Sequence, residues 1–161
     1  MQPAATSLTL DLPDESATAR LGAALARRLR IGDAILLSGD LGAGKTSLAR
    51  AILRAAANDP ALEVPSPTFT LVQAYELPGL TISHFDLYRV VDPTELREIG
   101  FDEAADTGAV LVEWPERAAA QMPRSALTIR LSLAGAGRSA ELSGPSEWQE
   151  RLLGLPQEAR L

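Results

Sequence analysis

The sequence predicts an α/β fold built on a mixed parallel and antiparallel sheet. Two short apolar runs without alternation are typical of strands buried on both faces, and segments of helical periodicity lie between the strands. The second half also contains two strand–turn–strand patterns, which indicate antiparallel hairpins. With 161 residues, 46% of them hydrophobic and 22% charged, the chain is expected to form one domain spanning residues 1–161.

The first half supplies two strands and two helices. The acid-rich segment 14–18 is suited to the start of a helix, and Leu21, Leu25 and Leu29 give that helix an apolar stripe. The run 34–38 is short, apolar and followed by glycines, as expected of a buried strand. In chain order, we expect a weakly alternating edge strand at 8–12, a helix from 14–18 to near Gly32, a strand at 34–38 and a helix at 45–57.

The second half supplies the hairpins and another buried strand. Pro78-Gly79 and the segment 134–137 carry the turn residues that separate paired strands. In chain order, we expect a loop at 64–67, strands at 69–75 and 80–87, a helix at 93–105, a buried strand at 109–113, strands at 126–133 and 138–142, and a last helix at 147–153.

Charge and composition exclude several classes of function. The net charge of −6 argues against an unaided grip on nucleic acid, and the lack of cysteine excludes disulfides and thiolate chemistry. The N-terminal segment does not resemble a signal peptide, and no apolar stretch is long enough to span a bilayer. We therefore expect a cytoplasmic protein without a membrane partner.

The strongest motif is Gly39-Asp40-Leu41-Gly42-Ala43-Gly44-Lys45-Thr46, which matches the phosphate-binding pattern G-x-x-x-x-G-K-[ST]. The strand before it and the helix after it are the context that the motif needs, and they predict a P-loop NTPase-like three-layer sandwich. Lys45 is expected to reach the β- and γ-phosphates, and the Thr46 hydroxyl to ligate Mg²⁺. The expected nucleotide contacts of this segment are Leu41, Gly42, Ala43, Gly44, Lys45, Thr46 and Ser47.

Two acids at predicted strand ends are candidates for the metal and for orienting water. Asp86 lies at the end of the strand predicted at 80–87, and Glu113 follows four apolar residues in the pattern of a Walker B strand. We expect Lys45, Asp86 and Glu113 to be catalytic, and Thr46, Asp86 and Glu113 to hold Mg²⁺. Either acid can instead be a solvated strand terminus, and the sequence leaves open which one ligates Mg²⁺ directly.

Three further residues are switch or partner candidates. Thr68 lies in the loop after the P-loop helix, where a threonine can sense the γ-phosphate, although it can also only cap a turn. His84 shares a strand face with Asp86 and is equally consistent with a hydrogen-bonded structural histidine. Trp114 follows Glu113 and serves either packing or contact with the nucleotide or a partner.

Together these segments resemble the TsaE family (formerly YjeE), small ATPases of bacterial tRNA threonylcarbamoyladenosine synthesis. The resemblance rests on the P-loop, Ser66-Pro67-Thr68-Phe69, His84-Phe85-Asp86-Leu87-Tyr88-Arg89 and Glu113-Trp114, and it is weak beyond Pro115. It implies binding of ATP and Mg²⁺, slow hydrolysis, and action with a TsaD-like transferase and a TsaB-like subunit, which would hold the tRNA. It also implies that Glu15 and Thr18 lie near the adenine, that Arg138 lies near the nucleotide, and that Trp114 is needed for function.

Two other functions use the same phosphate cradle. A small-molecule kinase needs an arginine-rich lid, but Arg27, Arg28 and Arg30 lie before the loop, in a poor place for one. A GTP-dependent switch needs an Asn-Lys-x-Asp tetrapeptide, which this sequence lacks. The sequence leaves open whether an arginine that stabilises the transition state comes from Arg138 or from a partner.

Overall fold

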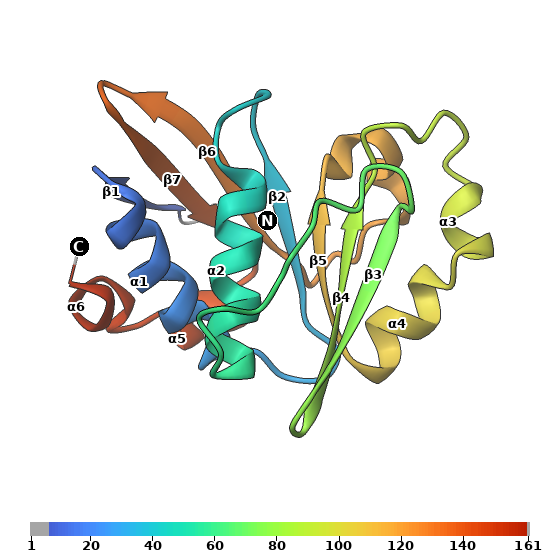
Figure 1. Ribbon diagram of the computed structural model, residues 1–161, viewed down its shortest axis with the longest axis horizontal. Helices are drawn as coiled ribbons and strands as arrows, with labels where there is room; N and C mark the ends of the chain where they lie inside the picture. The colour runs from blue at the N-terminus through green and yellow to red at the C-terminus, as the bar shows by residue number, and fades with distance from the viewer. Residues whose placement is uncertain (1–6, 161) are drawn as a thin grey trace.

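The computed structural model describes residues 7–160 and places a seven-stranded mixed sheet at the centre of the fold (Figure 1). Its spatial order is β1-β7-β6-β2-β5-β4-β3. The central pairs β6–β2, β2–β5 and β5–β4 are parallel, and the outer pairs β1–β7, β7–β6 and β4–β3 are antiparallel. The strands are β1 (Ser7–Leu12), β2 (Ala34–Ser38), β3 (Val72–Leu77), β4 (Leu80–Asp86), β5 (Ala109–Glu113), β6 (Leu127–Ala134) and β7 (Gly137–Ser143). The predicted α/β fold with a mixed sheet is confirmed.

Helices cover both faces of the sheet, as the predicted three-layer sandwich requires (Figure 1). They are α1 (Glu15–Ala26), α2 (Lys45–Ala57), α3 (Glu95–Glu98), α4 (Phe101–Thr107), the 3₁₀ segment η1 (Pro115–Gln121), α5 (Ser146–Arg151) and α6 (Leu155–Ala159). α1 and α2 pack on one face, and α3 and α4 lie beside the other. Within residues 7–160, no helix combines the length and the apolar character that crossing a membrane requires.

Strand β5 shows why the central strands read as unbroken apolar runs. Ala109 and Leu111 face the core beneath α1 and α2, whereas Val110 and Val112 face a second core with Phe85 of β4. The first four residues of β5 are apolar and buried, so this part of the strand lacks the alternating polar positions of a solvent-facing sheet, and only Glu113 at its end is charged. The parallel central strands end at one edge, which therefore gathers the loop after β2 with the last residues of β4 and β5.

The first helix is shorter than predicted. Asp14 caps its start by accepting the Ala17 N–H at 2.8 Å, but the helix ends at Ala26 rather than near Gly32. The Asp33 carboxylate accepts the Arg30 N–H at 2.7 Å, and this local bond stabilises a turn in place of further helix.

Other boundaries also depart from the prediction. The helix predicted at 93–105 is split into α3 and α4, because Gly100 adopts a left-handed conformation (φ 80°). Strand β3 begins at Val72, after Leu71 with a positive φ of 68°. α5 is not the last helix, because Gly154 turns the chain into α6. The segment η1 was not predicted.

Candidate functional site

The phosphate loop connects β2 to α2, as the motif predicts. Gly39 has a φ of 141°, and a Cβ there would lie 2.4 Å from the Leu131 carbonyl oxygen, so no larger residue fits. Gly44 has a φ of 105° and precedes the first residue of α2. The loop therefore leads into the positive end of a helix dipole, the arrangement by which proteins bind phosphate groups.

Two adjoining cavities bring the predicted site residues together. The first, of about 390 Å³, lies over the loop and is lined by Leu41, Gly42, Gly44, Lys45, Thr46, Ser47, Ser66, Thr68, Asp86, Tyr88, Glu113, Trp114 and Arg138. The second, of about 260 Å³, shares Gly44, Ser47 and Arg138 with the first and adds Glu15, Thr18 and Ala43. Of the predicted site residues, His84 alone lines neither of these cavities, because it lies buried against Glu113.

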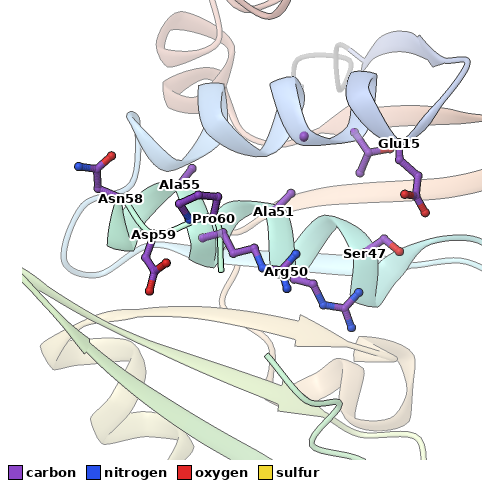
Figure 2. Close-up of a pocket in the computed structure, with 11 residues that line it drawn as sticks. Glu15, Ser47, Arg50, Ala51, Ala55, Asn58, Asp59 and Pro60 are labelled. Carbon is purple, nitrogen blue, oxygen red and sulfur yellow. The ribbon is translucent and has the colours of Figure 1, made fainter. Parts of the chain in front are cut away.

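A third cavity, of about 480 Å³, continues the site between α1 and α2. Figure 2 shows Glu15 on α1 and Ser47 and Arg50 on α2 along this groove, with Asn58 and Pro60 at its far end. Because Glu15, Thr18 and Ser47 line this groove and the second cavity, the two form a continuous depression beside the phosphate loop.

Lys45 is held back against its own loop. Its ammonium donates hydrogen bonds to the carbonyl oxygens of Gly39 at 2.5 Å and Asp40 at 2.8 Å, and it lies 4.1 Å from the centroid of the Trp114 ring. Burial lowers the pKa of Lys45, against the opposing effect of the nearby acids, of which Glu113 acts most strongly. The site thus holds a positive charge with little water around it, which strengthens its attraction for phosphate.

Glu113 joins the loop to the sheet. Its Oε1 accepts a hydrogen bond from the Thr46 hydroxyl at 2.7 Å, and its Oε2 lies 2.6 Å from His84 Nε2. The carboxylate is 2% exposed, so the interpretation of Glu113 as a solvated strand end is wrong. The contact to Thr46 places this acid beside the hydroxyl that the motif assigns to a metal.

Asp86 is directly opposite Glu113 in the β4–β5 register and is 4% exposed. Its Oδ2 accepts hydrogen bonds from Thr68 at 3.0 Å and from Ser66 at 3.4 Å, and its Oδ1 accepts the Tyr88 N–H at 3.0 Å. Asp86 therefore holds the loop that carries Thr68 against the end of β4. Thr68 does more than cap a turn, because its hydroxyl bonds an acid from another element.

The backbone at Trp114 has an unfavourable conformation. Trp114 has a φ of 59°, a left-handed conformation that is rare in large side chains, and it lies directly after Glu113. Its ring lies over Lys45 and packs 5.0 Å from the Tyr88 ring. Tyr88 received no role from the sequence, although its position two residues after Asp86, where its N–H can reach the carboxylate, was a usable signal.

The donor set fits a triphosphate with Mg²⁺ better than a metal held by protein alone. Among residues 7–160, no three side chains of His, Cys, Asp or Glu gather to form a metal cluster. Mg²⁺ is commonly held by one or two carboxylates together with phosphate oxygens and water, and Thr46, Glu113 and Asp86 provide that partial set beside the loop.

The sequence of the chain matches a known protein family and several of its members. Residues 12–140 match the family described as threonylcarbamoyl adenosine biosynthesis protein TsaE. The chain is 38% identical to a tRNA threonylcarbamoyladenosine biosynthesis protein TsaE from Haemophilus influenzae, over 84% of this chain and 89% of the relative. It is 43% identical to the protein of that name from Rickettsia felis, over 66% of this chain but only 62% of the relative.

A solved protein structure has a fold similar to that of this chain. The crystal structure of YdiB from Bacillus subtilis is similar to this chain with a TM-score of 0.74 and 26% identity, over 97% of this chain and 98% of the other. The family match also reaches past Arg138, further than the motifs in the sequence alone extended the resemblance.

Proposed function

The chain belongs to the TsaE family, and from that premise we propose that it is a Mg²⁺-dependent ATPase subunit of tRNA threonylcarbamoyladenosine biosynthesis. Its relatives are named for that pathway. The proposed activity is binding of ATP and slow hydrolysis, in support of the transfer of a threonylcarbamoyl group to the adenosine beside the tRNA anticodon.

One observation carries the proposal: the Thr46 hydroxyl bonds Glu113 at 2.7 Å at the start of α2, while Asp86 lies opposite Glu113 on the neighbouring strand. A glycine-rich turn that arose by chance would have no reason to end beside two buried acids. The same cavity contains Lys45 and Arg138, so positive charge and metal-binding oxygens line one space.

Each residue then has a distinct task. Lys45 and the N–H groups of the loop bind phosphate oxygens, and Arg138, which lies beside Gly44, adds a second positive charge. Thr46 and Glu113 would hold Mg²⁺, and the ion would supply positive charge that stabilises charge on the phosphates. Asp86 would provide a second acid near the metal, and its hydrogen bond from Thr68 holds that threonine at the site. Glu15 and Thr18 line the second cavity, where they would contact the nucleoside.

The position of the three arginines that follow α1 argues against a small-molecule kinase and so favours the ATPase. Arg27 and Arg28 both pair with Glu158 of α6, and Arg28 also donates to the Arg151 carbonyl at 2.8 Å. None of the three cavities at the site is lined by Arg27, Arg28 or Arg30. Arg27 and Arg28 therefore hold the end of α1 against α6, and all three arginines are badly placed to close over a phosphate acceptor.

Incubation with ATP labelled in the γ-phosphate separates the two activities. We expect slow Mg²⁺-dependent release of inorganic phosphate, and Thr46→Ala to abolish it. Label in a phosphorylated small molecule would instead support the kinase. The experiment should be repeated with a TsaD-like transferase and a TsaB-like subunit, since the family resemblance leads us to propose these as partners that hold the tRNA. We expect them to accelerate release, and equal rates with and without them would contradict partner dependence.

A further inference from the structure

His84, the chain's only histidine, lies at the bottom of the site without lining it. It is 0% exposed on β4 and faces the same core as Ile82, beneath α1 and α2. Its Nε2 lies 2.6 Å from Glu113 Oε2, so its one hydrogen bond goes to an acid of the proposed metal site.

The two oxygens of Glu113 have different partners. Oε1 is bonded to Thr46 on α2, and Oε2 to His84 on β4. With one oxygen held from each side, the carboxylate cannot rotate about its last bond without breaking a hydrogen bond. Asp86 is fixed differently, by the Tyr88 N–H and by the loop hydroxyls of Ser66 and Thr68.

The surroundings of the ring also fix the position of its proton. His84 Nδ1 is buried and has no hydrogen-bond partner within residues 7–160. A proton on Nδ1 would therefore be an unsatisfied buried donor, whereas a proton on Nε2 is shared with a carboxylate. An apolar side chain could fill this buried position, but it would leave Glu113 Oε2 without its hydrogen bond from β4, so the histidine is explained by its bond to Glu113 and not by packing alone.

We propose that His84 is a positioning residue: its Nε2–H donates to Glu113 Oε2 and orients Oε1 toward Thr46 and the metal. The inference rests on the proposed function, because it assigns His84 a task at that Mg²⁺ site. Groups that orient a metal ligand through the ligand's other polar atom typically change metal affinity 10- to 100-fold when they are removed.

The test measures how much Mg²⁺ is needed to tighten the binding of the fluorescent nucleotide mant-ATP. We expect His84→Leu to raise the half-saturating Mg²⁺ concentration about 10- to 100-fold, with mant-ATP affinity in EDTA changed less than about twofold. His84→Gln, whose amide nitrogen can donate from a position similar to Nε2, should stay within about threefold of wild type. Ser83→Ala is the matched control, because Ser83 is a buried polar neighbour on the same strand and belongs to the opposite face.

A second readout needs neither nucleotide nor metal. Because the chain has one histidine, ¹⁵N-histidine labelling gives a single pair of ring nitrogen signals. We expect the proton on Nε2 in the wild-type protein, and a change in its signal in Glu113→Gln. A bare Nε2 would overturn the proposal.

The possible results distinguish the positioning role of His84 from the proposed function of the chain. If folded His84→Leu needs no more Mg²⁺ than wild type, or if His84→Gln loses as much as His84→Leu, the positioning role is wrong and the proposed function stands. A wild-type chain that does not bind mant-ATP at all would overturn the proposed function and, with it, the role of His84. Unfolding curves of each variant show whether it is folded before binding is compared.

Discussion

Gly22 lies where α1 and α2 approach most closely, and its replacement by alanine tests how the two helices pack. A Cβ at Gly22 would lie 2.5 Å from Ala51 Cβ, 2.8 Å from the Ala51 carbonyl carbon and 2.9 Å from the Ile52 nitrogen. Carbon atoms in normal contact are about 3.5–4.0 Å apart, so the helices must separate by about 1 Å.

Two opposing effects determine how much Gly22→Ala changes the free energy of unfolding. Overpacking of a core contact costs about 1–3 kcal/mol, whereas glycine to alanine inside a helix stabilises it by about 1 kcal/mol. Two of the three short contacts are to backbone atoms that cannot rotate away, so the cost lies in the upper part of its range. We expect a net loss of about 1–2 kcal/mol in the free energy of unfolding, or about 2–8 °C in Tm for a chain of this size.

Urea and thermal unfolding followed by circular dichroism measure this change. Ala19→Gly, at an exposed position of α1, is the control that measures helix propensity alone, and it should lower stability by about 1 kcal/mol. If Gly22→Ala leaves Tm unchanged or raises it, the close approach of α1 and α2 is wrong.

Two further predictions concern stability at low pH and the Thr68 loop. Hydrogen bonds from Arg28 and then Arg27 hold the pKa of Glu158 below its ordinary value of 4.5. The stabilisation that Glu158 contributes is therefore complete above pH 4.5 and is lost as pH falls from 4.5 through the lower folded pKa. Glu158→Gln should reduce the fall in Tm that accompanies this acidification. An identical fall in Tm in the variant and the wild type would contradict the ion pair. Asp86→Asn should speed amide hydrogen exchange at Leu71, whose N–H donates to the Pro67 carbonyl of the tethered loop at 2.7 Å, whereas Glu113→Gln should not. Equal exchange in both variants would contradict the tether.

The elements predicted to the residue have strong signals in the sequence. β2 and β5 are unbroken apolar runs because the sheet is covered on both faces, and the Gly-rich motif fixes where α2 begins. The weaker boundaries depend on single residues whose backbone conformation the pattern did not reveal. Gly100 looked like part of a helix, and its left-handed conformation ends α3 and starts α4.

The residues of the site could be predicted from the sequence, but the hydrogen bonds between them could not. The loop, Asp86 and Glu113 follow from motif and strand-end position, and the structure places them around one cavity. That Glu113 bonds Thr46 and His84 while Asp86 bonds Thr68 depends on the register of β4 against β5, which aligns the two acids. Register depends on contacts between strands far apart in the chain, so no local pattern reveals it.

Calorimetric titration of ATP into the protein, with Mg²⁺ and with EDTA, tests the central claim most directly. We expect one ATP site per chain, whose affinity for ATP rises when Mg²⁺ is present. Thr46→Ala removes the hydroxyl that bonds Glu113 and should reduce this Mg²⁺-dependent gain about tenfold, or about 1.4 kcal/mol. Absence of binding, or the same gain from Mg²⁺ in Thr46→Ala as in wild type, would contradict the assignment of this cavity as a Mg²⁺-ATP site.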